Sequence, residues 1–243
     1  MNKELIKKRF SKKLSTYNEH AKIQKQMAEK LLNILPENHY KTVLEIGCGT
    51  GLLTTLAQNK INCSKYIALD IVSDCADYIN TINPEIEFVN ADAEEYIKIC
   101  EKFDLIISNA SLQWVENFPE FIKKLIQKLK PNGVLLLSTF GTENFREIFY
   151  ASGKTLPYYS KNDLSEILKE YNPIIENEIR IMAFKTPKEV LHHIQNTGVN
   201  AISSESWTKK DLIKFEKEYN LFCACHPTLT YNPMYILIRN VVK

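Results

Sequence analysis

The residues best suited to chemistry lie in one glycine-rich segment, Glu45-Ile46-Gly47-Cys48-Gly49-Thr50-Gly51. Glycine has no Cβ, so glycines at alternate positions let the backbone turn sharply and lie directly against a ligand. The apolar run at 43–46 predicts a strand that leads into this loop, and a helix after the loop would direct its N-terminal amide groups at the ligand. The segment therefore predicts a site for a nucleotide-like cofactor.

Two classes of cofactor fit a glycine loop that follows a strand. Dinucleotides use the spacing G-x-G-x-x-G and place a pyrophosphate on the helix N-terminus. The spacing here is G-x-G-x-G, and Glu45 stands two residues before Gly47. An acidic residue at this position favours a cationic cofactor without phosphate groups.

Polar side chains follow the next three apolar runs. Asp70 ends the second run, where a carboxylate can accept hydrogen bonds from both hydroxyls of a ribose. Asp92 stands just past the third run, in position to accept from an adenine amine, and Asn109 follows the fourth run and should face the glycine turn. Either aspartate alone would more often be a helix N-cap. Together with the loop, these residues predict a cofactor site along several strand ends.

The elements that position these residues alternate between apolar runs and amphipathic stretches. A spacing of about 20 to 30 residues is typical of βαβ units, which build a parallel sheet with helices on both faces. The expected fold class is an α/β, doubly wound, Rossmann-like sheet, mostly parallel with an antiparallel last strand. The five parallel strands are expected at 43–46, 66–69, 86–89, 105–108 and 134–139.

The segments outside this sheet are predicted to be mainly helical. Residues 1–40 should form a helical arm or lid, with two helices between 2 and 35 and a break near 15–18, and residues 41–243 should form the main, cofactor-binding domain. Helical insertions near 142–160 and 186–225, after the fifth and sixth strands, should cover the site. A helix at 118–129 should end at the turn Pro131-Asn132-Gly133. The later elements are expected as helices at 143–150, 161–171, 187–197 and 208–220, with strands at 174–184 and 229–240.

The composition excludes several classes of function. Lysine and arginine total 31 against 29 aspartates and glutamates, so the net charge of +2 favours neither nucleic acid nor a membrane surface as partner. The six cysteines lack framework spacing, which is typical of a reducing compartment, and no apolar run approaches the roughly 20 residues that span a bilayer. We therefore expect a cytoplasmic protein. Cys223-Ala224-Cys225-His226 has no second ligand pair at a familiar spacing, so no metal is expected.

Residues 41–141 resemble the class I S-adenosylmethionine-dependent methyltransferases through the glycine loop and the polar strand ends. The resemblance implies that S-adenosylmethionine is the cofactor and S-adenosylhomocysteine its product. Glu45 and the loop would hold the amino-acid end, Asp70 the ribose and Asp92 the adenine, with Asn109 beside the methionine portion. The implied cofactor residues are Glu45, Gly47, Gly49, Gly51, Asp70, Asp92 and Asn109.

Nearly the whole chain also resembles the malonyl-acyl-carrier-protein O-methyltransferases, which start pimelate synthesis for biotin. The segments that carry this resemblance are Arg9 to Gln24, Asn109 to Trp114, Ser138 to Ile148, Asn196 to Ala201 and Leu229 to Pro233. Asn232 departs from the histidine expected there in many relatives. The resemblance implies transfer of a methyl group to the free carboxylate of a malonyl thioester on acyl carrier protein, which forms a methyl ester.

The implied reaction needs positioning more than acid–base chemistry. A malonyl carboxylate is already ionised at neutral pH, so it can attack a sulfonium methyl group without a general base. Holding the reacting atoms in line could lower the barrier by about 7–11 kcal/mol in the best cases. Charge is cancelled as the reaction proceeds, so exclusion of water helps and a lid is expected.

Several residues are candidates for the acceptor side of the site. Tyr17 is expected to close over the methyl-transfer centre as a lid residue, although aromatic helix packing is the plain alternative. Arg146, after the fifth strand, is expected to orient the malonyl carboxylate with its planar guanidinium, although it could be an ordinary surface arginine. The other substrate-side candidates are Phe10, Gln113, Trp114 and His193.

An acidic acyl carrier protein would be steered by basic patches on its enzyme. Two lysine-rich clusters could serve, although either could be a solvated face: Lys3, Lys7, Lys8, Arg9, Lys12 and Lys13, and then Lys123, Lys124, Lys128 and Lys130. Two competing functions share the cofactor motifs. One is methylation of another small carboxylate or a quinone precursor, and the other is cofactor binding without catalysis.

Overall fold

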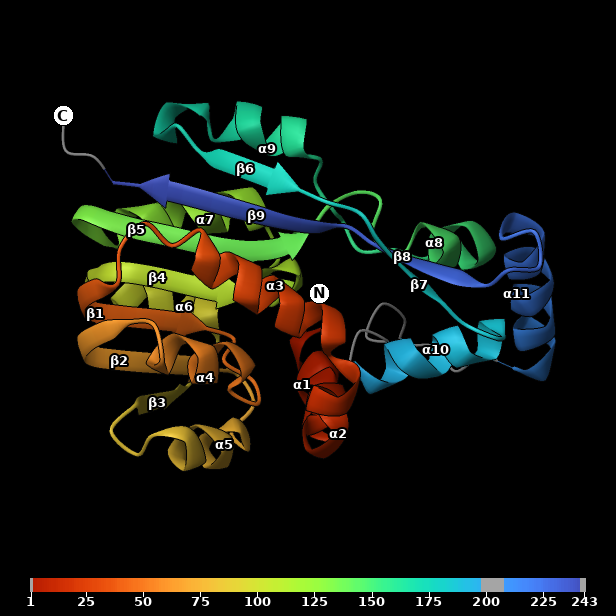
Figure 1. Cartoon of the computed structure of the whole chain (residues 1–243), viewed down its shortest axis with the longest axis horizontal. Helices are drawn as coiled ribbons and strands as arrows, with labels where there is room; N and C mark the ends of the chain where they lie inside the picture. Colours follow the sequence, from red (N-terminus) through yellow and green to blue (C-terminus); the bar gives the residue numbers. More distant parts are fainter. Residues whose placement is uncertain (1, 198–207, 241–243) are drawn as a thin grey trace.

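The computed structural model describes residues 2–197 and 208–240, and its centre is a seven-stranded sheet in the order β3-β2-β1-β4-β5-β9-β6 (Figure 1). Strands β1 to β5 run parallel, and β9 runs antiparallel between β5 and β6. This confirms the expected doubly wound sheet with an antiparallel last strand. The strands are β1 (His39–Ile46), β2 (Asn62–Asp70), β3 (Glu87–Asn90), β4 (Phe103–Asn109), β5 (Leu129–Phe140), β6 (Ile174–Asn177), β7 (Arg180–Ala183), β8 (Thr228–Tyr231) and β9 (Pro233–Arg239).

Helices cover both faces of the sheet, and successive strand residues contribute to two separate cores. Val43 belongs to the core under α3, α4 and α5, whereas its neighbour Leu44 belongs to the core under α6, α7 and α9. Burial on both faces makes each strand almost continuously apolar. The helices are α1 (Lys3–Ser11), α2 (Leu14–His20), α3 (Lys22–Asn33), α4 (Leu52–Gln58), α5 (Cys75–Ile82), α6 (Ala93–Ile99), α7 (Phe118–Gln127), α8 (Arg146–Ser152), α9 (Lys161–Ile167), α10 (Pro187–Asn196) and α11 (Lys209–Phe222), with 3₁₀ turns η1 (Leu112–Trp114) and η2 (Lys169–Tyr171).

The N-terminal arm contains three helices rather than the two expected. The predicted break near residues 15–18 is wrong, because α2 runs through it and the chain bends instead after Ser11 and at Ala21. Ala21 is fully buried at the corner between α2 and α3. Tertiary packing of this small residue, rather than the local preference of Ser15, therefore sets the break. Figure 1 shows α1 and α2 beside the carboxyl ends of the parallel strands.

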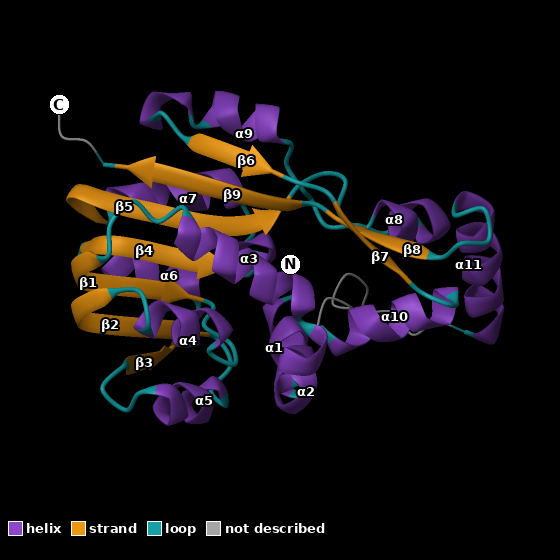
Figure 2. Ribbon diagram, in the orientation of Figure 1, coloured by secondary structure: helices purple, strands orange, loops and turns teal. Residues whose placement is uncertain are grey.

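The strands expected at 174–184 and 229–240 each divide into two. β6 pairs with β9 in the main sheet, whereas β7 pairs with β8 in a separate two-stranded sheet that leads toward α8, α10 and α11 (Figure 2). The division falls at Asn232, whose Nδ2 donates to the carbonyl of Glu178 across the ribbon at 2.8 Å. Where the ribbon leaves the sheet, this side-chain bond stands beside the last backbone bond, from the Glu178 amide to the Pro233 carbonyl at 3.0 Å.

The turn expected at Pro131-Asn132-Gly133 is also wrong, because these residues lie inside β5. Helix α7 ends at Gln127, and β5 pairs Leu129 with Phe103 but Val134 with Leu105. The extra residues form a bulge, in which Asn132 has a left-handed φ of 63°. None of the described helices is long and apolar enough to cross a membrane.

Candidate active site

A deep cleft lies at the carboxyl ends of β1, β2 and β4, where open α/β sheets bind ligands. It consists of two adjoining hollows, of which the one beside Tyr17 and Gln24 is the larger. The residues that line both hollows are Ile6, Gly47, Asp70, Ile71, Ser111 and Trp114. Ile6 comes from α1, so the arm forms part of the wall.

The glycine loop forms the floor of the cleft. Gly47 has a φ of 71°, and a Cβ placed on it would lie 1.9 Å from Ser111 Oγ. A Cβ on Gly49 would lie 3.2 Å from the Phe10 ring, so this glycine makes room for the arm. Gly51 does not line either hollow; a Cβ there would lie 2.1 Å from Ile82 of α5, so this glycine serves helix packing.

Asp70 ties the end of β2 to the glycine loop. Its Oδ2 accepts from the Gly49 amide and its Oδ1 from the Val72 amide, each at 2.9 Å. Burial raises the pKa of this carboxyl, and the Val72 and Gly49 amides oppose the shift. The carboxylate lines both hollows, as a group that binds ribose hydroxyls should.

Asp92 lies in the smaller hollow and is also the N-cap of α6. Its Oδ1 accepts from the Glu94 amide at 2.9 Å, and its Oδ2 pairs with Lys3 Nζ at 2.6 Å. Lys3 also pairs with Glu94 at 2.5 Å. The adenine candidate is therefore held by the first helix of the arm, a contact that the sequence did not suggest.

Asn109 joins the end of β4 to the arm and to β5. Its Nδ2 donates to the backbone carbonyl of Gln24 on α3 at 3.0 Å, and its Oδ1 accepts from Ser138 at 2.6 Å. The next residue, Ala110, has a left-handed φ of 48°. This turn directs the following Ser111 against the glycine loop. The loop after β4 therefore faces the loop after β1, as the sequence predicted.

Glu45 lies behind the loop and does not line the cleft. Its Oε2 accepts from Thr54 at 2.8 Å and from Tyr66 at 2.6 Å, and its Oε1 is buried without a partner in the described structure. Burial raises the pKa of this carboxyl to about 7, against the opposing hydrogen bonds. The side chain anchors the loop from below, and the expected role of Glu45 at the amino-acid end of the cofactor stays a prediction.

The acceptor-side candidates divide into two groups. Phe10, Tyr17, Gln113 and Trp114 line the larger hollow, and the Phe10 and Tyr17 rings meet edge to face at 5.1 Å. Burial and, to a lesser extent, the negative charge of Asp70 raise the pKa of Tyr17. Its hydroxyl therefore remains a neutral donor. Phe10 and Tyr17 thus form part of the wall that the arm contributes, and their role as a lid stays a prediction.

Arg146 and His193 lie outside both hollows. The Arg146 side chain is 46% exposed and pairs with Glu143 at 3.3 Å. His193 Nε2 forms a hydrogen bond with the Tyr231 hydroxyl at 2.8 Å. Burial and, to a lesser extent, repulsion from His20 and Lys22 lower the pKa of His193 to about 4. Neither residue therefore supplies a positive charge to the cleft in this structure.

The chemistry available in the larger hollow is that of neutral hydrogen-bonding groups and one carboxylate. No lysine, arginine or histidine of the described chain lines it. Within residues 2–197 and 208–240, no three histidine, cysteine, aspartate or glutamate side chains gather as a metal site. The cleft can thus position a cationic ligand and exclude water from it.

Sequence reasoning named no site role for Gln24, and it placed Thr50, Ser111 and Thr197 in the glycine loop and the family-like segments without assigning them a contact. All four line the larger hollow. Gln24 carried a readable signal, because it shares the buried face of its helix with the apolar residues Met27 and Ala28. The other three residues line the hollow because the tertiary fold brings their segments together there. Residues 198–201 of the family-like segment at 196–201 lie outside the described residues.

Comparison with known proteins identifies the class to which this cleft belongs. A sequence family described as a methyltransferase domain matches residues 17–173. The fold resembles a putative methyltransferase from Bacillus halodurans, with a TM-score of 0.64, 16% identity and coverage of 88% of this chain and 99% of that one. It also resembles the N-methyltransferase NodS of Bradyrhizobium japonicum in complex with S-adenosyl-L-homocysteine, with a TM-score of 0.57, 13% identity and coverage of 97% and 98%. The protein is therefore an S-adenosylmethionine-dependent methyltransferase.

Full-length relatives define the family more closely. A malonyl-[acyl-carrier protein] O-methyltransferase from Calditerrivibrio nitroreducens is 37% identical over 96% of this chain and 95% of its own length. The enzyme of that name from Chlorobium luteolum is 33% identical over 98% and 95%. The chain belongs to the malonyl-[acyl-carrier protein] O-methyltransferase family.

Proposed function

We propose that this protein methylates the free carboxylate of malonyl-acyl-carrier protein, and that the resulting ester primes pimelate synthesis for biotin. The observation that carries the proposal is the similarity to relatives of that name along almost the entire chain, arm and insertions included. The segments outside the sheet determine the substrate, because the sheet and loop serve many methyltransferases. Free, scattered thiols are in keeping with a cytoplasmic enzyme.

The cleft suits this cofactor at several points of its surface. S-adenosylmethionine supplies a methyl group on a cationic sulfur. We propose that Asp70 accepts from the ribose, that Asp92 accepts from the adenine amine, and that Asn109 borders the methionine portion. Gly47 leaves the space that a side chain would fill. Glu45 acts through the loop that it supports.

The neutral lining of the larger hollow suits a carboxylate nucleophile. A cation bound to the malonyl oxygen would lower its nucleophilicity, and no basic side chain of the described chain lines this hollow. Tyr17 can donate one hydrogen bond that orients the carboxylate without neutralising it. Phe10, Trp114 and Phe140 exclude water, which strengthens the attraction between the carboxylate and the sulfonium.

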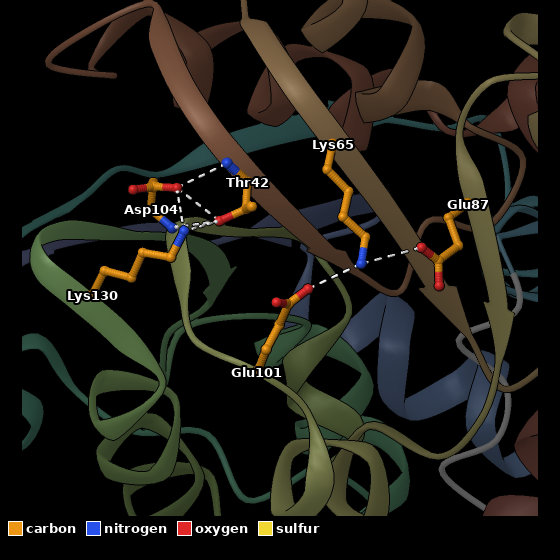
Figure 3. A network of polar contacts seen from close by, with 6 residues as sticks. All are labelled: Thr42, Lys65, Glu87, Glu101, Asp104 and Lys130. Carbon is orange, nitrogen blue, oxygen red and sulfur yellow. Dashed lines mark hydrogen bonds and ion pairs between the residues drawn. The ribbon is translucent and has the colours of Figure 1, made fainter.

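Of the two basic clusters, the one on the arm is better placed to receive an acidic carrier protein. Lys8 and Lys12 are exposed on the arm that borders the cleft. In the other cluster, Lys123 pairs with Glu120 and Lys130 with Asp104. Figure 3 shows Lys130 in a polar network with Thr42 and Asp104. Asp104 and Lys130 lie near the amino ends of β4 and β5, whereas the cleft lies at the carboxyl ends of the strands. We therefore propose that a transient carrier-protein complex forms over α1.

A direct assay tests the proposed function. The purified protein is incubated with S-adenosylmethionine and malonyl-acyl-carrier protein, and intact-protein mass spectrometry is expected to show the addition of one methyl group. Acetyl-acyl-carrier protein, which has no free carboxylate, serves as the matched control and should gain nothing. If the protein binds the cofactor and leaves the malonyl substrate unmodified, the proposal fails. Malonyl-coenzyme A in a parallel reaction reports the preference for the carrier.

Arg146 remains a proposed contact of the malonyl carboxylate, one that orients the group from outside the larger hollow and does not neutralise the attacking oxygen, and its position makes the test informative. To reach the cleft, the guanidinium must leave Glu143, with which it pairs on the protein surface. Arg146→Ala is expected to lower kcat/KM for malonyl-acyl-carrier protein by roughly tenfold or more, because a charge-assisted hydrogen bond would be lost, and to leave cofactor affinity unchanged. Lys161→Ala, an exposed basic residue at the start of α9, is the control. Normal turnover of Arg146→Ala would remove this residue from the site.

A further inference from the structure

Two glutamines that line the larger hollow have buried side-chain carbonyl oxygens without a hydrogen-bond partner among the described residues. Gln24 Oε1 and Gln113 Oε1 are both buried, and neither has a hydrogen-bond partner in the described structure. Gln24 is only 3% exposed. Buried polar atoms in native proteins are nearly always hydrogen-bonded, because an orphaned acceptor loses its hydration without compensation. Two such atoms in one ligand cleft indicate that a donor arrives with the ligand.

Both glutamines are fixed beside the turn that ends β4. The Gln24 carbonyl accepts from Asn109 Nδ2 at 3.0 Å, which fastens α3 to this turn. Gln113 Nε2 donates to the Ala110 carbonyl at 2.8 Å, so its amide nitrogen is engaged and its oxygen remains as the free group. The two residues are therefore held at the same turn from different elements, Gln24 from the arm and Gln113 from η1.

The strand order determines which part of the cofactor reaches these oxygens. Asp92 follows β3, Asp70 ends β2, the glycine loop follows β1 and Asn109 ends β4, and these strands are neighbours in that order. A cofactor with its adenine near Asp92 and its ribose on Asp70 crosses the glycine loop toward β4. Its amino-acid end then lies beside Gln24 and Gln113.

We infer that Gln24 Oε1 accepts a hydrogen bond from the ammonium group of the cofactor's methionine portion, with Gln113 Oε1 as the second acceptor. An ammonium carries three donors and no acceptor, so it satisfies both oxygens at once. The cofactor's carboxylate has no donor to offer them. Because Gln24 belongs to the arm, cofactor binding and seating of the arm over the cleft become coupled. The inference rests on the cofactor assignment and not on the malonyl substrate.

Calorimetry with three ligands tests this inference through the Gln24→Leu variant. S-adenosylhomocysteine and its decarboxylated analogue both carry the ammonium, whereas 5′-methylthioadenosine lacks the whole amino-acid end. Loss of a charge-assisted hydrogen bond should weaken the first two ligands by roughly tenfold or more. Binding of 5′-methylthioadenosine should be unchanged. Gln26→Leu makes the same chemical change at an exposed position of α3 and should alter none of the three.

Each other outcome counts against the inference. Equal weakening of 5′-methylthioadenosine would show a general structural role, and unchanged binding of the decarboxylated analogue would show that the ammonium is not the partner. A thermal melt checks that Gln24→Leu folds. Should it not fold, Gln24→Glu keeps an acceptor oxygen and must then bind the decarboxylated analogue at least as tightly as the original protein does. No acyl substrate is involved, so failure of malonyl methylation leaves this test intact.

Discussion

Replacing Gly47 with alanine is expected to weaken binding of S-adenosylhomocysteine by roughly 30-fold or more, since overpacking and backbone strain each cost about 1–3 kcal/mol. The added Cβ would lie 1.9 Å from Ser111 Oγ and 2.4 Å from Ser111 Cβ. Rotation of the serine side chain can move Oγ but not Cβ, so the backbone at Ser111 must shift. Both residues line both hollows, and the shift therefore distorts the cleft itself.

Two further variants separate this clash from backbone strain. Gly153 also has a left-handed φ, 68°, but no atom lies within 4 Å of a Cβ placed there. Gly153→Ala should therefore lower thermal stability slightly and leave calorimetric affinity unchanged. Combining Gly47→Ala with Ser111→Gly removes the clashing side chain and should restore part of the affinity. Undiminished binding by Gly47→Ala alone would contradict the steric argument.

The local patterns of the sequence predicted the sheet well because both of its faces are buried. Strands such as β4 are buried on both sides, so each was predictable from a short apolar run. The loop after β1 was predictable because its three glycines, all with positive φ, have a spacing that is unusual in other structures. Predictions failed where tertiary contacts override local preference. Ala21 sets the arm's corner through burial, and Asn232 divides a long ribbon through one side-chain bond.

The site shows the same division between local and tertiary information. Strand-end residues such as Asp70 and Asn109 were predictable, because the carboxyl ends of parallel strands share one edge of the sheet. Glu45 shows what the motif alone does not report: its position in the loop predicted a ligand contact, whereas its hydrogen bond from Tyr66 depends on how β1 and β2 pack. The roles of Gln24 and Lys3 depend on where the arm docks, which no spacing within the sheet reports.

Asp70→Asn should produce the other large loss of cofactor affinity. The amide replaces one acceptor oxygen by a donor, which must then face either a backbone amide that Asp70 now binds or a ribose hydroxyl. A hydrogen bond to a charged group contributes about 1.5–3 kcal/mol, so each one lost weakens binding by roughly 10- to 150-fold. Calorimetry with S-adenosylhomocysteine measures the loss. Asp77→Asn, the same change at an exposed position of α5, should cause none.

A 2′-deoxy analogue of the cofactor distinguishes two roles of Asp70, which are to bind the ribose and to support the glycine loop. In the original protein, removal of the ribose 2′-hydroxyl should weaken binding, because the buried Asp70 carboxylate loses a donor that water does not replace. In Asp70→Asn the same removal should matter less, since the altered side chain already binds that hydroxyl poorly. If both proteins lose equal affinity for the 2′-deoxy ligand, Asp70 does not contact the ribose and serves only to hold Gly49 in place.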